Sequence, residues 1–203
     1  MQVVKLMTRI VLLIALFGNV ALGQNYEQTH TAQECGTWAT PADVEQLNLL
    51  RTQMERRGGI QNRSFNTVPV TVHIVRQSDG SGGLTGQQIQ SVIEGVNHLF
   101  ADAFIEFSIC GGIRFIDSDR FFYFQQTEED ILTRRFNAPN TLNIFFTGAV
   151  KDSKGNNLCG YAYFPAAAKD HVIMANSCAL NGSSLAHELG HYFGLYHTHG
   201  KTN

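Results

Sequence analysis

The sequence contains little charge of either sign. Charged residues make up 16% of its 203 positions, and the formal net charge is −2. No run of Lys and Arg occurs, so nothing in the composition indicates binding to nucleic acid. Internal repeats and low-complexity tracts are also missing, while hydrophobic residues make up 43%. We therefore expect a folded chain with a buried core, comprising one domain or one domain plus a small appendage.

The N-terminus contains an apolar run, at residues 10–17, that is too short to cross a bilayer. A spanning helix needs roughly 20 apolar residues. Lys5 and Arg9 precede the run, and small residues at 21–23 follow it, which is the pattern of a cleaved signal peptide. We therefore predict that residues 1–23 are a signal peptide and that the protein is secreted, without a stable membrane anchor.

Cysteine is scarce, with four in the chain: Cys35, Cys110, Cys159 and Cys178. In an oxidising compartment an even number indicates disulfides, and four cysteines allow three pairings. Cys159 and Cys178 lie on two consecutive predicted strands, so we favour a bridge between them. Cys35 and Cys110 are then available for a second bridge.

Predicted strands and helices alternate along the chain. A helix capped by Thr40 is expected over residues 40–59, and a long helix with a Thr85–Gln88 capping box follows residue 85. Strands are expected at 68–77, 105–117, 141–150, 158–164 and 171–177, a short helix at 128–136, and a last helix capped by Ser183 or Ser184. This alternation predicts an α/β fold with a mostly parallel sheet.

The last predicted helix contains the chemistry of a metal site. His187 and His191 are four residues apart, so both imidazoles share one helix face. Glu188 lies beside them, where a base can take a proton from metal-bound water. Gly194 can end the helix, and His197 can then supply a third ligand. Three nitrogen ligands with one open position are typical of catalytic zinc, so we predict a zinc cofactor.

The stretch HELGHYFGLYH, residues 187–197, resembles the HExxHxxGxxH motif of metzincin metalloproteases. The next residue is Thr198, and GLYHT at 194–198 is similar to the pappalysin (cytophagalysin-like) family of secreted endopeptidases. The resemblance implies a twisted sheet, a backing helix near residues 86–103 and an active-site helix from about Ser184. It also implies zinc ligands His187, His191 and His197.

The same resemblance implies peptide-bond hydrolysis of protein substrates, with Glu188 as general base and proton shuttle. The stretch GYAYF, residues 160–164, would be an edge strand that pairs antiparallel with an extended substrate. An ordinary edge strand is the alternative. Four further histidines have no partner at ligand spacing and are interpreted as surface or strand residues: His30, His73, His98 and His171.

Cys35, in QECGTW, resembles the cysteine of latency segments that block the zinc in metzincin proenzymes. A thiolate is a good zinc ligand and would displace the catalytic water. Residues 24–63 would then be a propeptide, and residues 64–203 the upper part of the catalytic domain. A disulfide between Cys35 and Cys110 remains the alternative.

The sequence departs from the metzincin pattern after the third histidine. Metzincins continue into a lower subdomain with a methionine beneath the zinc, whereas all four methionines here precede the motif: Met1, Met7, Met54 and Met174. We expect a fragment of a longer protease whose lower subdomain is absent. The alternative is a secreted zinc-binding protein without proteolytic activity.

Overall fold

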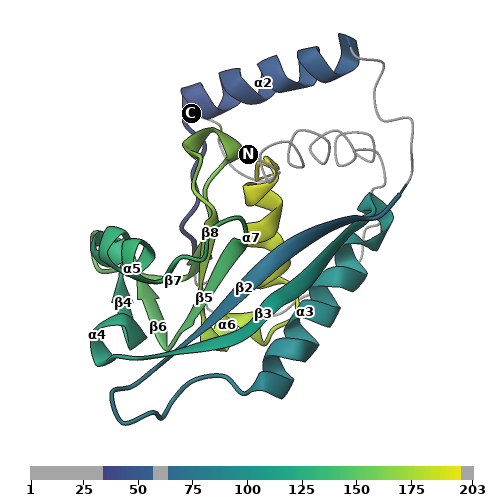
Figure 1. The fold of residues 1–203 in the computed structure, drawn as a ribbon. Coiled ribbons are helices and arrows are strands. Elements are labelled where there is room, and N and C mark those ends of the chain that lie inside the picture. Colours follow the sequence, from purple (N-terminus) through teal and green to yellow (C-terminus); the bar gives the residue numbers. More distant parts are fainter. Residues whose placement is uncertain (1–33, 57–63, 198–203) are drawn as a thin grey trace, which may run out of the picture.

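The computed structural model describes residues 34–56 and 64–197, which form a mixed sheet with helices packed against it (Figure 1). Neighbouring strands follow the order β3-β2-β5-β8-β7-β6-β4, and β1 pairs with β7. The strands are β1 (Glu34–Cys35), β2 (Asn66–Arg76), β3 (Ile105–Asp117), β4 (Tyr123–Gln125), β5 (Leu142–Thr147), β6 (Ala149–Lys151), β7 (Asn157–Tyr161) and β8 (His171–Ala175). Only the β6–β7 and β7–β8 pairs are antiparallel. The predicted α/β fold with a mostly parallel sheet is confirmed.

The helices and short 3-10 turns fill the connections between the strands. They are α2 (Pro41–Arg56), α3 (Gly86–Phe100), η1 (Ala101–Ala103), α4 (Asp119–Phe122), η2 (Gln126–Glu128), α5 (Glu129–Phe136), η3 (Pro165–Ala167), α6 (Asn176–Ala179) and α7 (Ser184–Tyr192). None of the helices in the described ranges combines the length and the apolar character that crossing a bilayer requires.

The core lies between the sheet and the helices α3 and α7. The central strand β5 is buried at every position, and α3 packs against both β3 and α7. The apolar stripe of α3, for example Ile89 and Val96, is in this core. The helix begins with the predicted capping box, in which Thr85 accepts from the Gln88 backbone and the Gln88 side chain accepts from Thr85. The backing helix implied by the metzincin resemblance is therefore present.

Two local predictions differ in detail from the structure. The strand expected at 141–150 is divided into β5 and β6 at Gly148, where a β-carbon would lie 2.2 Å from the ring of Phe122. The last helix begins at Ser184 and Ser183 occupies the N-cap position, as predicted, but the Ser183 side chain makes no capping hydrogen bond. Instead, the side-chain oxygen of Asn181 accepts hydrogen bonds from the backbone amides of Ser183 and Ser184. Asn181 lies two residues before the N-cap, so its side chain holds the turn that leads into the helix.

The N-terminal part of the described chain lies against the sheet and the last helix. Strand β1 pairs in parallel with β7, and α2 crosses the top of the molecule in Figure 1. Helix α2 is attached through Leu47, which packs with Phe164, Leu50 and Tyr196 in a cluster separate from the main core. This attachment brings residues 34–40, which we call the N-terminal segment, to the end of α7.

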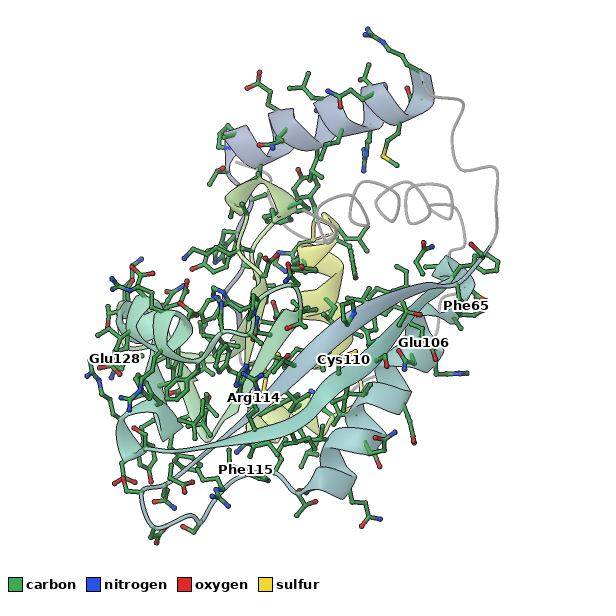
Figure 2. The ribbon with its side chains drawn as sticks, in the orientation of Figure 1. Phe65, Glu106, Cys110, Arg114, Phe115 and Glu128 are labelled. Carbon is green, nitrogen blue, oxygen red and sulfur yellow. A yellow bond between two sulfur atoms is a disulfide. The ribbon has the colours of Figure 1, made fainter. Side chains whose placement is uncertain are left out.

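The predicted bridge between Cys159 and Cys178 is present, with an S–S distance of 2.01 Å. It links β7 to α6. The alternative pairing of Cys35 with Cys110 is not formed, because both are free thiols. Cys110 is exposed on β3, which is the outer strand of the sheet (Figure 2).

Candidate metal centre

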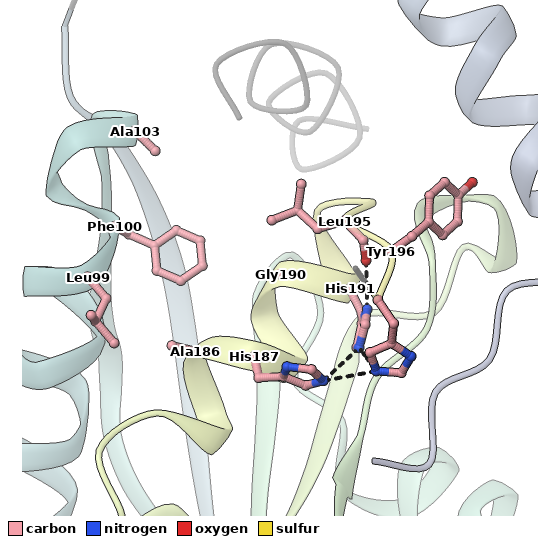
Figure 3. A pocket seen from close by; sticks show the side chains of 10 residues that line it. Leu99, Phe100, Ala103, Ala186, His187, Gly190, His191, Leu195 and Tyr196 are labelled. Atoms are coloured by element: carbon pink, nitrogen blue, oxygen red, sulfur yellow. Dashed lines mark hydrogen bonds between the residues drawn. The ribbon is translucent and has the colours of Figure 1, made fainter. Parts of the chain in front are cut away.

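Three histidine side chains converge at the C-terminal end of α7. The Nε2 atoms of His187, His191 and His197 form a triangle with sides of 3.0, 3.0 and 3.1 Å (Figure 3). His187 and His191 are presented from one face of α7, whose opposite face buries Leu185 and Leu189 in the core. The three residues that the sequence predicts as metal ligands are therefore brought together.

The turn after α7 places the third histidine. Gly194 has a φ of +90°, and its amide donates to the carbonyl of His191. The next amide, of Leu195, donates to the carbonyl of Gly190. This left-handed end of the helix reverses the chain, as the sequence predicts for a glycine at this position. A β-carbon on Gly194 would lie 2.7 Å from Leu47, so glycine also makes room for α2.

The donor chemistry of the three histidines fits a metal cation. His191 Nδ1 lies 2.6 Å from the carbonyl oxygen of Leu195, which can only accept, so Nδ1 carries the proton. The Nε2 atom of His191 then carries a free lone pair, and it faces the Nε2 atoms of His187 and His197. Burial, followed by the nearby His187 and His197, lowers the pKa of His191 to about 4. The ring is neutral at physiological pH, as a metal ligand must be.

Glu188 lies beside this triangle and is almost completely buried, with 1% of its surface exposed. Burial raises the pKa of its carboxyl group to about 7, and hydrogen bonds from Cys35 and Thr37 and from the backbone of Ala162 oppose that rise. A carboxyl group whose pKa lies near neutrality is matched to general acid–base work.

The N-terminal segment reaches both the histidines and Glu188. The Sγ atom of Cys35 lies within 4.8 Å of the ligand nitrogens of all three histidines and 3.5 Å from Glu188 Oε2. Burial, followed by the charge of Glu188, raises the pKa of the Cys35 thiol to about 12. Two residues later the hydroxyl of Thr37 lies 3.2 Å from Glu188 Oε2. The four candidate ligands and the candidate base thus form one cluster.

Strand β7 is not an edge strand beside this cluster, contrary to the sequence-based expectation. It lies between β8 and β6, and β1 pairs with it in parallel, with Cys35 opposite Gly160. The amide of Gly36 also donates to the carbonyl of Gly160. The N-terminal segment therefore occupies the side of β7 that we expected a substrate to use, and it runs in the opposite direction.

A cavity of about 470 Å³ opens on the other side of the histidines (Figure 3). One wall comes from α3, through Leu99 and Phe100, and from η1, through Ala103. The other comes from the chain that carries the candidate ligands, through Ala186 and Leu195. The walls are mostly apolar, so the cavity is suited to an apolar side chain.

Comparison with known proteins assigns the fold and the site to one family. The sequence pattern of metallopeptidase family M12B, reprolysin-like, matches residues 86–198, which cover the backing helix, most of the sheet and the three histidines. The chain belongs to this family. The predicted membership of the metzincin metallopeptidases is thereby confirmed, whereas the pappalysin subgroup is a finer assignment that the match does not address.

Curated relatives of this M12B-family chain are extracellular metalloproteases of fungi. One from Pyricularia oryzae is 26% identical over 152 residues, covering 67% of this chain and 52% of the relative. One from Podospora anserina is 31% identical over 180 residues, covering 76% and 59%. The chain spans about half the length of the Pyricularia relative. A promirolysin mutant of Tannerella forsythia has a similar fold, with a TM-score of 0.58, 22% identity and coverage of 80% of this chain and 69% of that one.

Sequence reasoning missed a second polar cluster in this family member. His73 lies in β2 and His171 in β8, in agreement with their interpretation as strand residues, but both are buried, with 1% and 3% of their surfaces exposed. His73 bonds Asn143, and His171 lies 3.2 Å from the buried carboxylate of Glu129. The only sequence signal was a histidine inside an apolar strand, which is too common to indicate a partner.

Proposed function

We propose that this chain is the metal-binding part of a secreted zinc endopeptidase. His187, His191 and His197 would hold the zinc, and Glu188 would be the general base. The convergence of three ring nitrogens beside a buried carboxylate supports this proposal most strongly, because a purely structural site has no use for the carboxylate. A zinc ion would act there as a Lewis acid that polarises the scissile carbonyl and acidifies the attacking water.

The residues of the chain divide the remaining chemistry among them. His191 presents its Nε2 lone pair because the Leu195 carbonyl holds the proton on Nδ1. Glu188 accepts the proton of the attacking water and returns it to the leaving amine. Its burial keeps the carboxyl pKa near 7, so the same group can accept and donate a proton at neutral pH. The backbone of Ala162, which bonds Thr37 in this structure, would bind an extended peptide.

The experiment that tests this function is the substitution Glu188→Gln. We expect the variant to retain one zinc per chain, measured by elemental analysis, and to lose cleavage of a generic protein substrate. Glu94→Gln, on the exposed face of α3, is the matched control and should leave both unchanged. Cleavage that survives in Glu188→Gln would contradict the assignment. Both substitutions are made in the chain freed of residues 24–63, and zinc binding without cleavage in that freed chain would favour the alternative, a zinc-binding protein without proteolytic activity.

We also propose that the structure represents a latent form, in which Cys35 supplies the fourth zinc ligand. Its Sγ atom is among the ligand atoms of the three histidines, and Thr37 covers Glu188. A bound cation would oppose the high pKa of the buried thiol, since a coordinating thiol loses its proton. Cys35→Ser should give activity without removal of the N-terminal segment. If Cys35→Ser stays latent while the chain freed of residues 24–63 is active, Cys35 is not the switch.

The finer assignments of the chain are proposals of the same kind. We assign residues 1–23 to a signal peptide, 24–63 to a propeptide and 64–203 to the upper part of the catalytic domain. Residues 1–33, 57–63 and 198–203 lie outside the described residues. The sequence GLYHT at 194–198 supports the pappalysin-like subgroup of metzincins. The substrate would be a protein or peptide in the extracellular space, as the names of the fungal relatives suggest.

A further inference from the structure

The carboxylate of Glu129 is the centre of a buried polar cluster that is distinct from the three candidate metal ligands. Glu129 is the first residue of α5, and 4% of its surface is exposed. The hydroxyls of Tyr161 and Tyr163 donate to its Oε2 at 2.8 and 2.5 Å. On its other oxygen, Lys169 forms an ion pair and His171 Nε2 lies 3.2 Å away. These partners come from the end of β7, from the following loop and from β8.

This cluster keeps Glu129 ionised and in one place. Burial alone would raise the pKa of the carboxyl group, but contacts with His171, Lys169 and Tyr163 lower it to about 2. A buried carboxylate is tolerated only while such partners remain. The contacts with Glu129 therefore also hold the side chains of its partners in place.

Two of the partners flank the backbone that lies over Glu188. Tyr161 is the last residue of β7 and the last one paired with β8, opposite Ile173. Residues 161–163, which we call the rim segment, begin at this last pair, and the two residues after Tyr161 have no strand pairing. The two tyrosines reach the same oxygen of Glu129, while Ala162 between them binds the hydroxyl of Thr37 through both its amide and its carbonyl, at 2.9 and 3.0 Å. The side-chain bonds to Glu129 thus replace the missing ladder bonds.

We propose that Glu129 is a positioning residue for the metal centre. Through Tyr161 and Tyr163 it holds the backbone of Ala162 where that backbone binds the chain lying over Glu188. In this structure the bound chain is the N-terminal segment, through Thr37. During catalysis it would be the peptide substrate, and this second part of the inference rests on the proposed function. The polar contacts of Glu129 in the described part of the chain go to Tyr161, Tyr163, Lys169 and His171 and to none of the three candidate metal ligands, so it acts through the rim segment.

The first test measures how fast the thiol of Cys35 reacts with a small alkylating reagent in the native, zinc-loaded chain. In Glu129→Gln we expect Cys35 to react about tenfold faster, since the charged anchor of the rim segment is lost. The exposed thiol of Cys110 is the internal reference and should react at its parental rate. Glu128→Gln is the matched control, because Glu128 precedes Glu129 but pairs only with Arg120 at the surface. Equal Cys35 rates in the two variants would overturn the proposal.

A general loss of stability must be separated from a loss of positioning. Ile93→Val shortens a core side chain on α3, far along the chain from the rim segment, and provides a variant with a lowered melting temperature. Each variant is labelled at the same number of degrees below its own melting temperature. The proposal requires Cys35 to react faster in Glu129→Gln than in Ile93→Val under these conditions. If Glu129→Gln does not fold, Tyr163→Phe removes one hydroxyl of the cluster and keeps the ring, with Tyr123→Phe at the surface as its control.

The second test uses peptide cleavage by chains that also carry Cys35→Ser. Glu129→Gln should raise KM for an extended peptide several-fold more than it lowers kcat, because binding to the rim segment is weakened while Glu188 is unchanged. A fall in kcat alone would overturn the substrate part of the proposal. If both the chain with Cys35→Ser alone and the chain freed of residues 24–63 bind zinc and cleave nothing, the proposed function fails, but the labelling result still decides the role of Glu129.

Discussion

Shortening Leu47 should release the N-terminal segment from the metal centre without unfolding the sheet. Leu47 is the buried anchor of α2, with 2% of its surface exposed. It packs on Phe164, Leu50 and Tyr196, in a cluster that is separate from the main core. It also lies directly over Gly194 in the turn that leads to His197. The substitution Leu47→Ala therefore weakens one attachment of α2 and leaves the core intact.

The size of the effect follows from the burial of this side chain. Truncation of a fully buried leucine to alanine costs about 2–5 kcal/mol. The cluster contains only two buried residues, so its neighbours can close part of the space, and we take the lower end, about 2 kcal/mol. A loss of 2 kcal/mol raises the population of the detached state about 30-fold, since 1.4 kcal/mol corresponds to a factor of about ten.

Amide hydrogen exchange measures this population. The amides of α2 and the amide of Gly36, which is bonded to the carbonyl of Gly160, should exchange about 30-fold faster in Leu47→Ala, while amides of β5 keep their protection. Leu49→Ala is the matched control, because it makes the same change on the same helix at a side chain that is 56% exposed. Equal exchange in the two variants would refute the view that this small cluster holds the N-terminal segment in place.

Four further outcomes are expected. Gly194→Ala should lower the unfolding free energy by about 1–3 kcal/mol and weaken zinc binding, because φ is +90° and the new β-carbon would meet Leu47; thermal melts and a zinc titration measure both effects. Asn181→Ala should cost about 1 kcal/mol of unfolding free energy through loss of the hydrogen bonds that hold the turn before α7, whereas Ser183→Ala should cost only a few tenths, because the Ser183 side chain makes no capping bond. Removal of the metal by a chelator should lower the melting temperature, and added zinc should restore it, because metal binding favours the folded chain. The pKa of Glu129 is lowered on folding from 4.5 to about 2, so its stabilisation is present above pH 4.5 and is lost as the pH falls toward 2; the difference in unfolding free energy between the parent and Glu129→Gln should shrink over that range and stay constant above it.

The elements whose signals are local in sequence could be predicted well. The spacing of His187, His191 and His197 predicted that these three side chains converge, because a helix followed by a glycine turn brings positions 187, 191 and 197 together without help from the rest of the chain. The Thr85–Gln88 capping box marked the start of α3. Alternation of strands and helices gave a mostly parallel sheet.

Predictions that depended on which strands become neighbours were less successful. Residues 160–164 were expected to lie at the edge of the sheet, but β1 pairs with β7 and covers that side. The pairing joins Cys35 to Gly160, and no pattern in the sequence of either strand specifies so distant a partner. Ser183 is the N-cap of α7, as predicted, but the side-chain hydrogen bonds at this end come from Asn181, since both residue types bond backbone amides well and only the backbone path selects between them.

The sequence by itself determined the geometry of the candidate metal centre, since its proposed ligands and base lie within eleven consecutive residues whose arrangement a helix and a glycine turn dictate. Only the tertiary structure decided what surrounds that centre. Cys35 and Glu188 are 153 positions apart, yet their side chains lie 3.5 Å from each other. Glu129, Tyr161 and His171 meet from three elements around one buried carboxylate. Such contacts form because burial forces each polar group to find a partner, and the chain offers many possible partners. The arrangement of the strands in the sheet decides which of these possible partners each polar group meets.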